Sequence, residues 1–153
     1  MNNYHYTECG LQNVYISGIE VILDDMGDEV ITIPAVAELH HVIALGIVMH
    51  EYSISGDELK FLRTEMGYSR TQLATLVHRD QQTVGRWERG ENEIDEVSEI
   101  VIRRLAIEKL SLETEQGIDE LSKSSVVSEN IQPIQISMNA ANENQYELVN
   151  LVA

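Results

Sequence analysis

Residues 67–90 constrain the fold of this chain more than any other stretch. Ser69 followed three residues later by Gln72 is typical of a helix start in which the two side chains cap the first backbone N–H groups. Asp80 is a favoured N-cap residue and predicts the start of a second helix. These caps predict two short helices joined by a tight turn. Apolar residues fall at spacings that turn them inward on the two helices: Leu73, Ala74, Leu76, Val77, Val84 and Trp87.

The second predicted helix has a polar outer side, formed by Gln81, Gln82, Gly85, Arg86 and Arg89. A helix that rests on protein through one face and carries amide and guanidinium groups on the other can enter the major groove of DNA and bond to base edges. On composition alone, a solvated first turn explains the two glutamines equally well. A second sequence feature is needed to choose between these interpretations.

That feature is the residue pattern of the whole segment, which resembles the phage-repressor (Xre-like) helix-turn-helix family. The family pattern is roughly Gly-x-Ser-Gln-x-x-Leu-Ala-x-x-Leu-Gly-Val-Ser-x-x-Thr-Val-Ser-x-Trp-Glu-x-Gly. The chain departs from it at Arg70, His78 and Arg79, and His78 would have to adopt the positive φ of the usual Gly, a region in which His is enriched. The matching residues are Gly67, Ser69, Leu73, Ala74, Thr83, Val84, Trp87, Glu88 and Gly90.

The resemblance implies roles for individual residues. Gln81 and Gln82 stand at positions that carry base contacts in the family, and Arg86, one turn further, is a candidate for a guanine edge or a phosphate. The matched positions also predict a largely buried ion pair between Arg63 and Glu88. Arg70, at the start of the helix that crosses the DNA backbone, is expected to reach a phosphate. Weaker phosphate candidates, for which simple solvent exposure is the alternative, are Thr71, Lys60, Arg79 and Arg89.

The formal net charge of −16 conflicts with DNA binding until its distribution is considered. Nine of the ten Lys and Arg residues lie between residues 60 and 109, whereas residues 1–54 contain eight acids and no base. Residues 60–90 carry six bases and three acids, a local charge of +3. We therefore expect a mildly basic DNA-facing unit whose acidic surroundings repel phosphate and limit non-specific binding.

The N-terminal flank combines strands with one apolar helix. Residues 14–33 contain three β-rich runs, and Pro34 suits the first turn of a helix that continues over residues 35–50. Apolar residues spread around most of the circumference of this helix. It is therefore expected to be buried on several sides of its own chain or against another subunit.

Ser55 with Glu58 repeats the capping pattern and predicts a helix that ends near Met66. The fold class expected is α+β, with a central four-helix DNA-binding unit. Its three parts are residues 1–54 (strands and helix, with a possible role in dimerisation), residues 55–110 (the helix-turn-helix domain) and residues 111–153. The remaining segments are a helix from Asp95 to about Leu110, a polar linker at 111–130 and a hairpin at 134–149 with its turn at 139–144.

Several other functions have little support in the sequence. Cys9 is the single cysteine, so neither an internal disulfide nor a cysteine-rich zinc site is expected. His40 and His41 are adjacent on a helix and point about 100° apart, which does not suit a shared metal. We expect no metal, no cofactor and no enzymatic activity. The apolar stretch at 42–49 is far shorter than a membrane span, which favours a cytoplasmic protein.

The function predicted is sequence-specific transcriptional regulation by a homodimer, most simply repression of its own or a neighbouring operon from an inverted-repeat operator. The helix at 35–50 is the favoured dimer interface. Residues 4–11 weakly resemble the start of bacterial regulators related to zinc-ribbon antitoxins, without the zinc ribbon. The alternative is therefore an antitoxin that binds a toxin protein through its acidic ends and autoregulates its operon. A regulator carried by a phage or mobile element is a third possibility.

Overall fold

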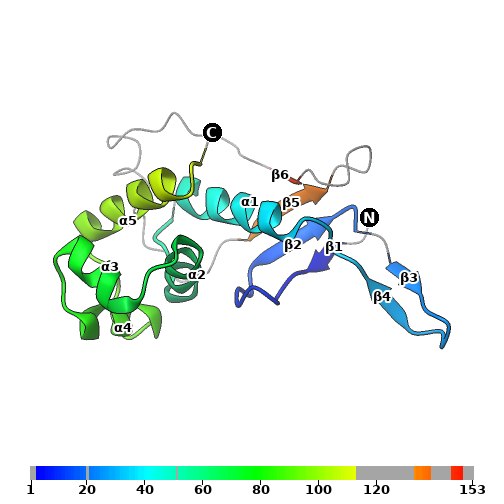
Figure 1. Ribbon diagram of the computed structural model, residues 1–153, viewed down its shortest axis with the longest axis horizontal. Helices are drawn as coiled ribbons and strands as arrows, with labels where there is room; N and C mark the ends of the chain where they lie inside the picture. The colour runs from blue at the N-terminus through cyan, green and yellow to red at the C-terminus, as the bar shows by residue number, and fades with distance from the viewer. Residues whose placement is uncertain (1–2, 20, 51, 113–132, 139–145, 150–153) are drawn as a thin grey trace.

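The computed structural model describes residues 3–19, 21–50, 52–112, 133–138 and 146–149. It is an α+β fold, as predicted: helices α2 to α5 form a bundle at one end, and a four-stranded sheet packs against α1 beside it (Figure 1). The elements in chain order are β1 (Asn3–His5), β2 (Val14–Ser17), β3 (Val21–Leu23), β4 (Glu29–Ile31), α1 (Val36–Met49), α2 (Gly56–Met66), α3 (Arg70–Val77), α4 (Gln81–Glu88), α5 (Glu96–Lys109), β5 (Ile134–Met138) and β6 (Tyr146–Leu148).

The four-stranded sheet joins the two ends of the described chain in the order β1-β2-β5-β6. β2 is antiparallel to β1 and parallel to β5, and the predicted C-terminal hairpin forms the antiparallel pair β5–β6. Val14 pairs with Ile134 and Ile16 with Ile136, and all four side chains are buried. The predicted turn of the hairpin lies outside the described residues, as does most of the predicted linker at 111–130.

Helix α1 lies close to this sheet. A Cβ added at Gly46 would lie 3.0 Å from Leu148 Cδ2 and 3.1 Å from Ile134 Cγ2, so the small residue permits the close approach. Other sides of α1 contact α2 and α5. Most of its apolar circumference is therefore covered within the chain, although Val36 in the first turn is 45% exposed. α1 begins at Val36, so Pro34 precedes the first turn instead of occupying it.

Buried polar side chains join α1 to the helical bundle. The Arg103 guanidinium of α5 donates to the carbonyl oxygens of Val48 (2.9 Å), His50 (2.9 Å) and Tyr52 (2.5 Å), which satisfies acceptors at the C-terminal end of α1. On the same helix, Glu99 accepts a hydrogen bond from Ile54 N–H at 2.5 Å. The sequence suggested no such role for Arg103, which is fully buried.

β3 and β4 form a separate antiparallel hairpin that extends away from the body of the molecule (Figure 1). Asp24 closes its turn, since its side chain accepts hydrogen bonds from the N–H groups of Met26 (2.9 Å) and Asp28 (2.8 Å). Gly27 adopts the positive φ of 82° that the turn requires. We call residues 21–31 the arm.

Candidate DNA interface

Side-chain hydrogen bonds fix the two helices that the sequence singled out. Ser69 and Gln72 cap each other's backbone N–H groups at the start of α3, and Asp80 accepts from Thr83 N–H at 2.7 Å at the start of α4. Between the helices, His78 adopts the left-handed conformation with φ 56° and ψ 43°. The turn therefore forms with His at the position where the resembling family has Gly.

The inner faces of α3 and α4 are buried through Leu73, Ala74, Val77, Val84 and Trp87. The prediction that Leu76 is also internal is wrong, because this side chain is 43% exposed. At about 100° per residue, Leu73, Val77 and Ala74 span one arc of α3, and Leu76 falls outside it.

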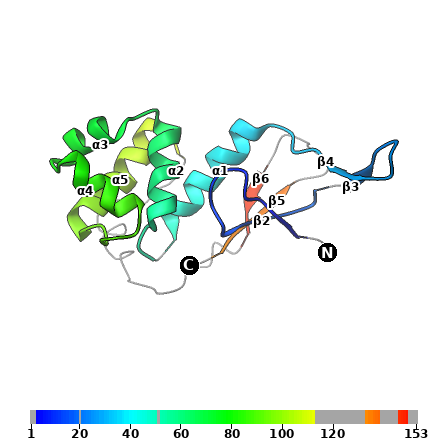
Figure 2. The same ribbon diagram turned by 90° about the horizontal axis from the view of Figure 1, so that it is seen from below.

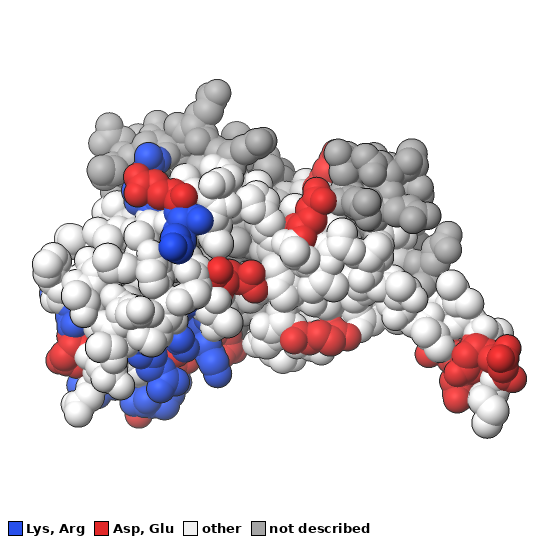
Figure 3. Space-filling model, in the orientation of Figure 1, with Lys and Arg blue, Asp and Glu red and all other residues white. Residues whose placement is uncertain are grey.

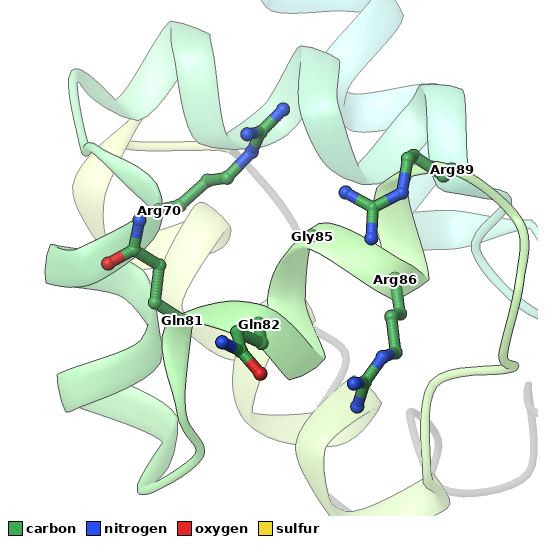
Figure 4. Close-up of a pocket in the computed structure, with 6 residues that line it drawn as sticks. All are labelled: Arg70, Gln81, Gln82, Gly85, Arg86 and Arg89. Atoms are coloured by element: carbon green, nitrogen blue, oxygen red, sulfur yellow. The ribbon is translucent and has the colours of Figure 1, made fainter.

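The outer side of α4 forms an open hollow of about 240 Å³. Figure 4 shows its lining, with Gly85 at the centre. Because Gly85 has no side chain, the Arg89 guanidinium can fold back over the helix: a Cβ at Gly85 would lie 3.0 Å from Arg89 Nη1. The residues that line the hollow are Arg70, Gln81, Gln82, Gly85, Arg86 and Arg89. The three predicted base-reading residues thus share one solvent-open surface with two of the predicted phosphate contacts.

Thr71 positions the first of the glutamines. Its hydroxyl donates to Gln81 Oε1 at 3.0 Å, so the amide oxygen of Gln81 is held against α3. The amide NH₂ of Gln81 then supplies the donors for a base edge or a phosphate. From the sequence, Thr71 was predicted to contact a phosphate, and its hydrogen bond to Gln81 was not predicted.

Glu88, at the end of α4, pairs with two arginines. Arg63 on α2 donates from Nε to Oε2 at 2.5 Å and from Nη2 to Oε1 at 3.1 Å, and Arg70 Nε lies 3.1 Å from Oε1. The Glu88 side chain is only 2% exposed, whereas that of Arg70 is 42% exposed. The carboxylate therefore ties α2, α3 and α4 together and holds Arg70 at the rim of the hollow.

Three of the predicted phosphate contacts are exposed side chains: Arg79, Arg89 and Lys60. Arg79 is paired with Asp95, the cap of α5, at 3.1 Å, and Arg89 with Glu91 at 2.8 Å; all four side chains are well exposed. Lys60 is exposed on α2. Asp95 was missed as a partner because sixteen residues separate it from Arg79, beyond the range of helical spacing rules.

Charge is unevenly distributed along the molecule. Figure 3 shows Lys and Arg at the helical end, where acidic side chains also lie, and a cluster of acidic side chains on the arm. Hydrogen bonding from Thr83 keeps the pKa of Asp80 below its usual value, so this cap stays ionised at the N-terminus of α4. The local base excess predicted for residues 60–90 thus lies in the helical end of the fold, away from the acidic arm.

Together, the capped helix pair, its buried inner face and the polar outer face of α4 define a helix-turn-helix DNA-binding unit. The family model described as Helix-turn-helix matches residues 59–106. This segment is therefore an Xre-like helix-turn-helix domain, as the sequence predicted, and the chain is a DNA-binding regulator in the general sense. Searches of curated proteins and of solved structures found no match.

Two further observations concern other kinds of site. Among the described residues, no group of three or more His, Cys, Asp or Glu side chains is arranged to hold a metal ion. None of the helices described in the structure combines the length and the apolar character that a membrane span requires.

Proposed function

We propose that this protein is a sequence-specific transcriptional repressor that binds an inverted-repeat operator as a homodimer and acts in the cytoplasm, where the DNA is. The observation that carries the proposal is the hollow on α4, where amide and guanidinium groups lie together on one exposed helix face. Amides and guanidinium groups are the side chains that read base edges in the major groove. Occupancy of a promoter by such a dimer blocks transcription without any further activity.

Within this surface, we assign base reading to Gln81, Gln82 and Arg86. Arg70, Lys60 and Arg89 supply phosphate contacts, and Thr71 acts through the orientation of Gln81. Arg79 contributes to phosphate binding only if its exposed pair with Asp95 opens, which costs little because exposed ion pairs contribute about 0–1 kcal/mol.

The proposal is tested by footprinting the DNA upstream of the protein's own gene and then measuring affinity for the protected site and for random DNA across a salt series. Gln82→Ala should weaken operator binding by about 1–3 kcal/mol and leave binding to random DNA nearly unchanged. Arg70→Ala should weaken both and reduce the salt slope by about one unit. An unchanged ratio of the two affinities in both Gln81→Ala and Gln82→Ala would show that α4 does not read bases.

A second function, antitoxin activity, is favoured by one observation: the arm carries exposed apolar side chains and a cluster of acids, which suits a basic protein. In this alternative, the arm neutralises a toxin while the helix-turn-helix domain autoregulates the operon. Co-expression with the product of a neighbouring gene tests it. A stable complex that relieves toxicity would establish the antitoxin function.

A further inference from the structure

The arm exposes an apolar surface that the rest of the described chain does not cover. Its strands pair Val21 with Ile31 and Ile22 with Val30, yet Ile22 is 54% exposed and Leu23 66% exposed. At the turn, Met26 is 85% exposed. A two-stranded hairpin of this kind is marginally stable by itself in water, and exposed contiguous apolar surface marks an interaction site.

The two edges of the arm differ chemically. β3 reads Val-Ile-Leu and has no charged residue, whereas β4 begins with Glu29. Natural sheet edges usually carry a Lys, a Pro or a bulge that prevents pairing with another chain. β3 has no such residue, and its outer edge pairs with no other strand among the described residues, so this edge can accept a further strand.

The acidic residues of the arm favour one of the two directions in which the arm of a second copy could pair with it. Asp24, Asp25 and Asp28 lie in the turn, at one end of the arm, and residues 1–54 contain no base to neutralise them. A parallel pair of arms would bring the two acidic turns together. An antiparallel pair places them at opposite ends and brings the apolar β3 strands into contact.

We propose that a second copy of this chain pairs with the arm through the edge of β3, so that two arms form one four-stranded antiparallel sheet around a two-fold axis. This pairing would be the interface of the homodimer proposed above. Its role in operator binding rests on that proposed function. The contact is isologous, since the same β3 edge serves both copies.

The size of the contact makes this a weak dimer. At the β3 edge itself, three large apolar side chains per arm are at least 46% exposed, namely Val21, Ile22 and Leu23. Six such side chains, at about 60–120 Å² each when fully covered, give at most on the order of 400–700 Å². Stable interfaces bury about 1,200–2,000 Å², so we expect dissociation in the micromolar range and dimer assembly on DNA that carries both half-sites.

This interface also changes the expected operator. The arm and α4 lie at opposite ends of the molecule in both views (Figures 1 and 2). Two copies joined through their arms therefore hold their recognition helices far apart. The half-sites should be separated by several helical turns of DNA instead of the single turn, about 34–36 Å, typical of compact dimers.

Disulfide trapping tests the register directly. In a Cys9→Ser background, which removes the single natural cysteine, Ile22→Cys should form a linked dimer under mild oxidation, because facing residues of antiparallel strands have Cβ atoms about 4.5–5.5 Å apart. Met26→Cys is the control, since the turns lie at opposite ends. The proposal is overturned if none of Val21→Cys, Ile22→Cys and Leu23→Cys links, or if Met26→Cys links equally well.

Sedimentation of the full chain tests the dimer independently. Leu23→Lys should convert the dimer to a monomer by placing a charge on the β3 edge. The hairpin itself should stay formed, because the new lysine faces Glu29 on β4. Val97→Lys is a matched control, since Val97 is 69% exposed on α5 and the charge change is the same. A wild-type protein that stays monomeric up to about 100 µM excludes the self-pairing and leaves the arm for a different protein.

The affinity of each variant for a single half-site separates the two proposals. If Leu23→Lys retains the wild-type affinity for one half-site but loses cooperative binding to two, both proposals hold. If wild-type protein dimerises through β3 but does not bind specific DNA, the arm inference survives and the proposed function fails.

Discussion

The Glu88 carboxylate serves two arginines that have different surroundings. Arg63 is largely buried, with a side chain that is 13% exposed, whereas Arg70 lies at the edge of the DNA-facing hollow. The first pair ties the end of α4 to α2, and the second keeps a cation beside the predicted base-reading residues. A single residue thus links domain stability to the charge of the candidate interface.

Glu88→Ala should therefore lower stability strongly. The change leaves the Arg63 charge buried without its carboxylate, which costs about 3–5 kcal/mol for a fully buried pair. Arg70→Ala removes the exposed partner of the same carboxylate and should cost less than about 1 kcal/mol. Urea denaturation of both variants makes the comparison, and an unchanged midpoint for Glu88→Ala would contradict the structural role of the pair.

At the scale of elements, local signals predicted the helices well. The caps at Ser55, Ser69, Asp80 and Asp95 each accept from a backbone N–H three residues ahead, so the information lies within one turn of each helix. Arg103 could not be predicted in the same way. Its acceptors lie at the end of α1, more than fifty residues earlier, and a helical Arg is ordinarily expected at the surface.

The stability of the contact between α1 and α5 should depend on the shape of the Arg103 side chain. Arg103→Lys keeps the charge but loses the planar fork that reaches three carbonyl oxygens, and Arg103→Met removes all the donors. Each buried acceptor left unsatisfied costs about 1–3 kcal/mol. We expect both variants to unfold at clearly lower urea concentration than wild type. Arg104→Met on the exposed side of α5 is the control, and an equal midpoint for Arg103→Met and Arg104→Met would refute the role of Arg103.

At the scale of the whole molecule, the sequence left two arrangements open. Periodicity indicated that the apolar helix is covered on several sides, but the same pattern fits a helix in its own core and a helix between subunits. The structure buries most of α1 within the chain and leaves Val36 exposed. The parallel pairing of Ile16 with Ile136 joins residues 120 positions apart, and no local spacing reports such a contact. The arm was predicted as strands, yet its separation from the main sheet depends on which strands pair, a property of the complete fold.

Glu58 joins three parts of this fold. Its carboxylate accepts from Asn13 in the N-terminal loop (3.3 Å) and from Ser55 N–H at the start of α2 (2.9 Å), and lies 3.3 Å from His50 Nε2 after α1. Burial raises the pKa of Glu58, but the hydrogen bond and charge of His50, with the bonds from Ser55 and Asn13, outweigh burial and hold the pKa below 4.5. The folded protein therefore binds this proton more weakly than the unfolded chain does.

The stability that Glu58 contributes should consequently be complete above pH of about 4.5 and lost as the pH falls through the lower folded-state pKa. Glu58→Gln is the matched control, because a Gln side chain can still cap the Ser55 N–H group but does not titrate. Urea unfolding at a series of pH values should show wild type losing stability more steeply than Glu58→Gln below pH of about 4.5, so that the two curves converge. Parallel curves would mean that the ionised carboxylate does not hold the sheet, α1 and the helix-turn-helix domain together.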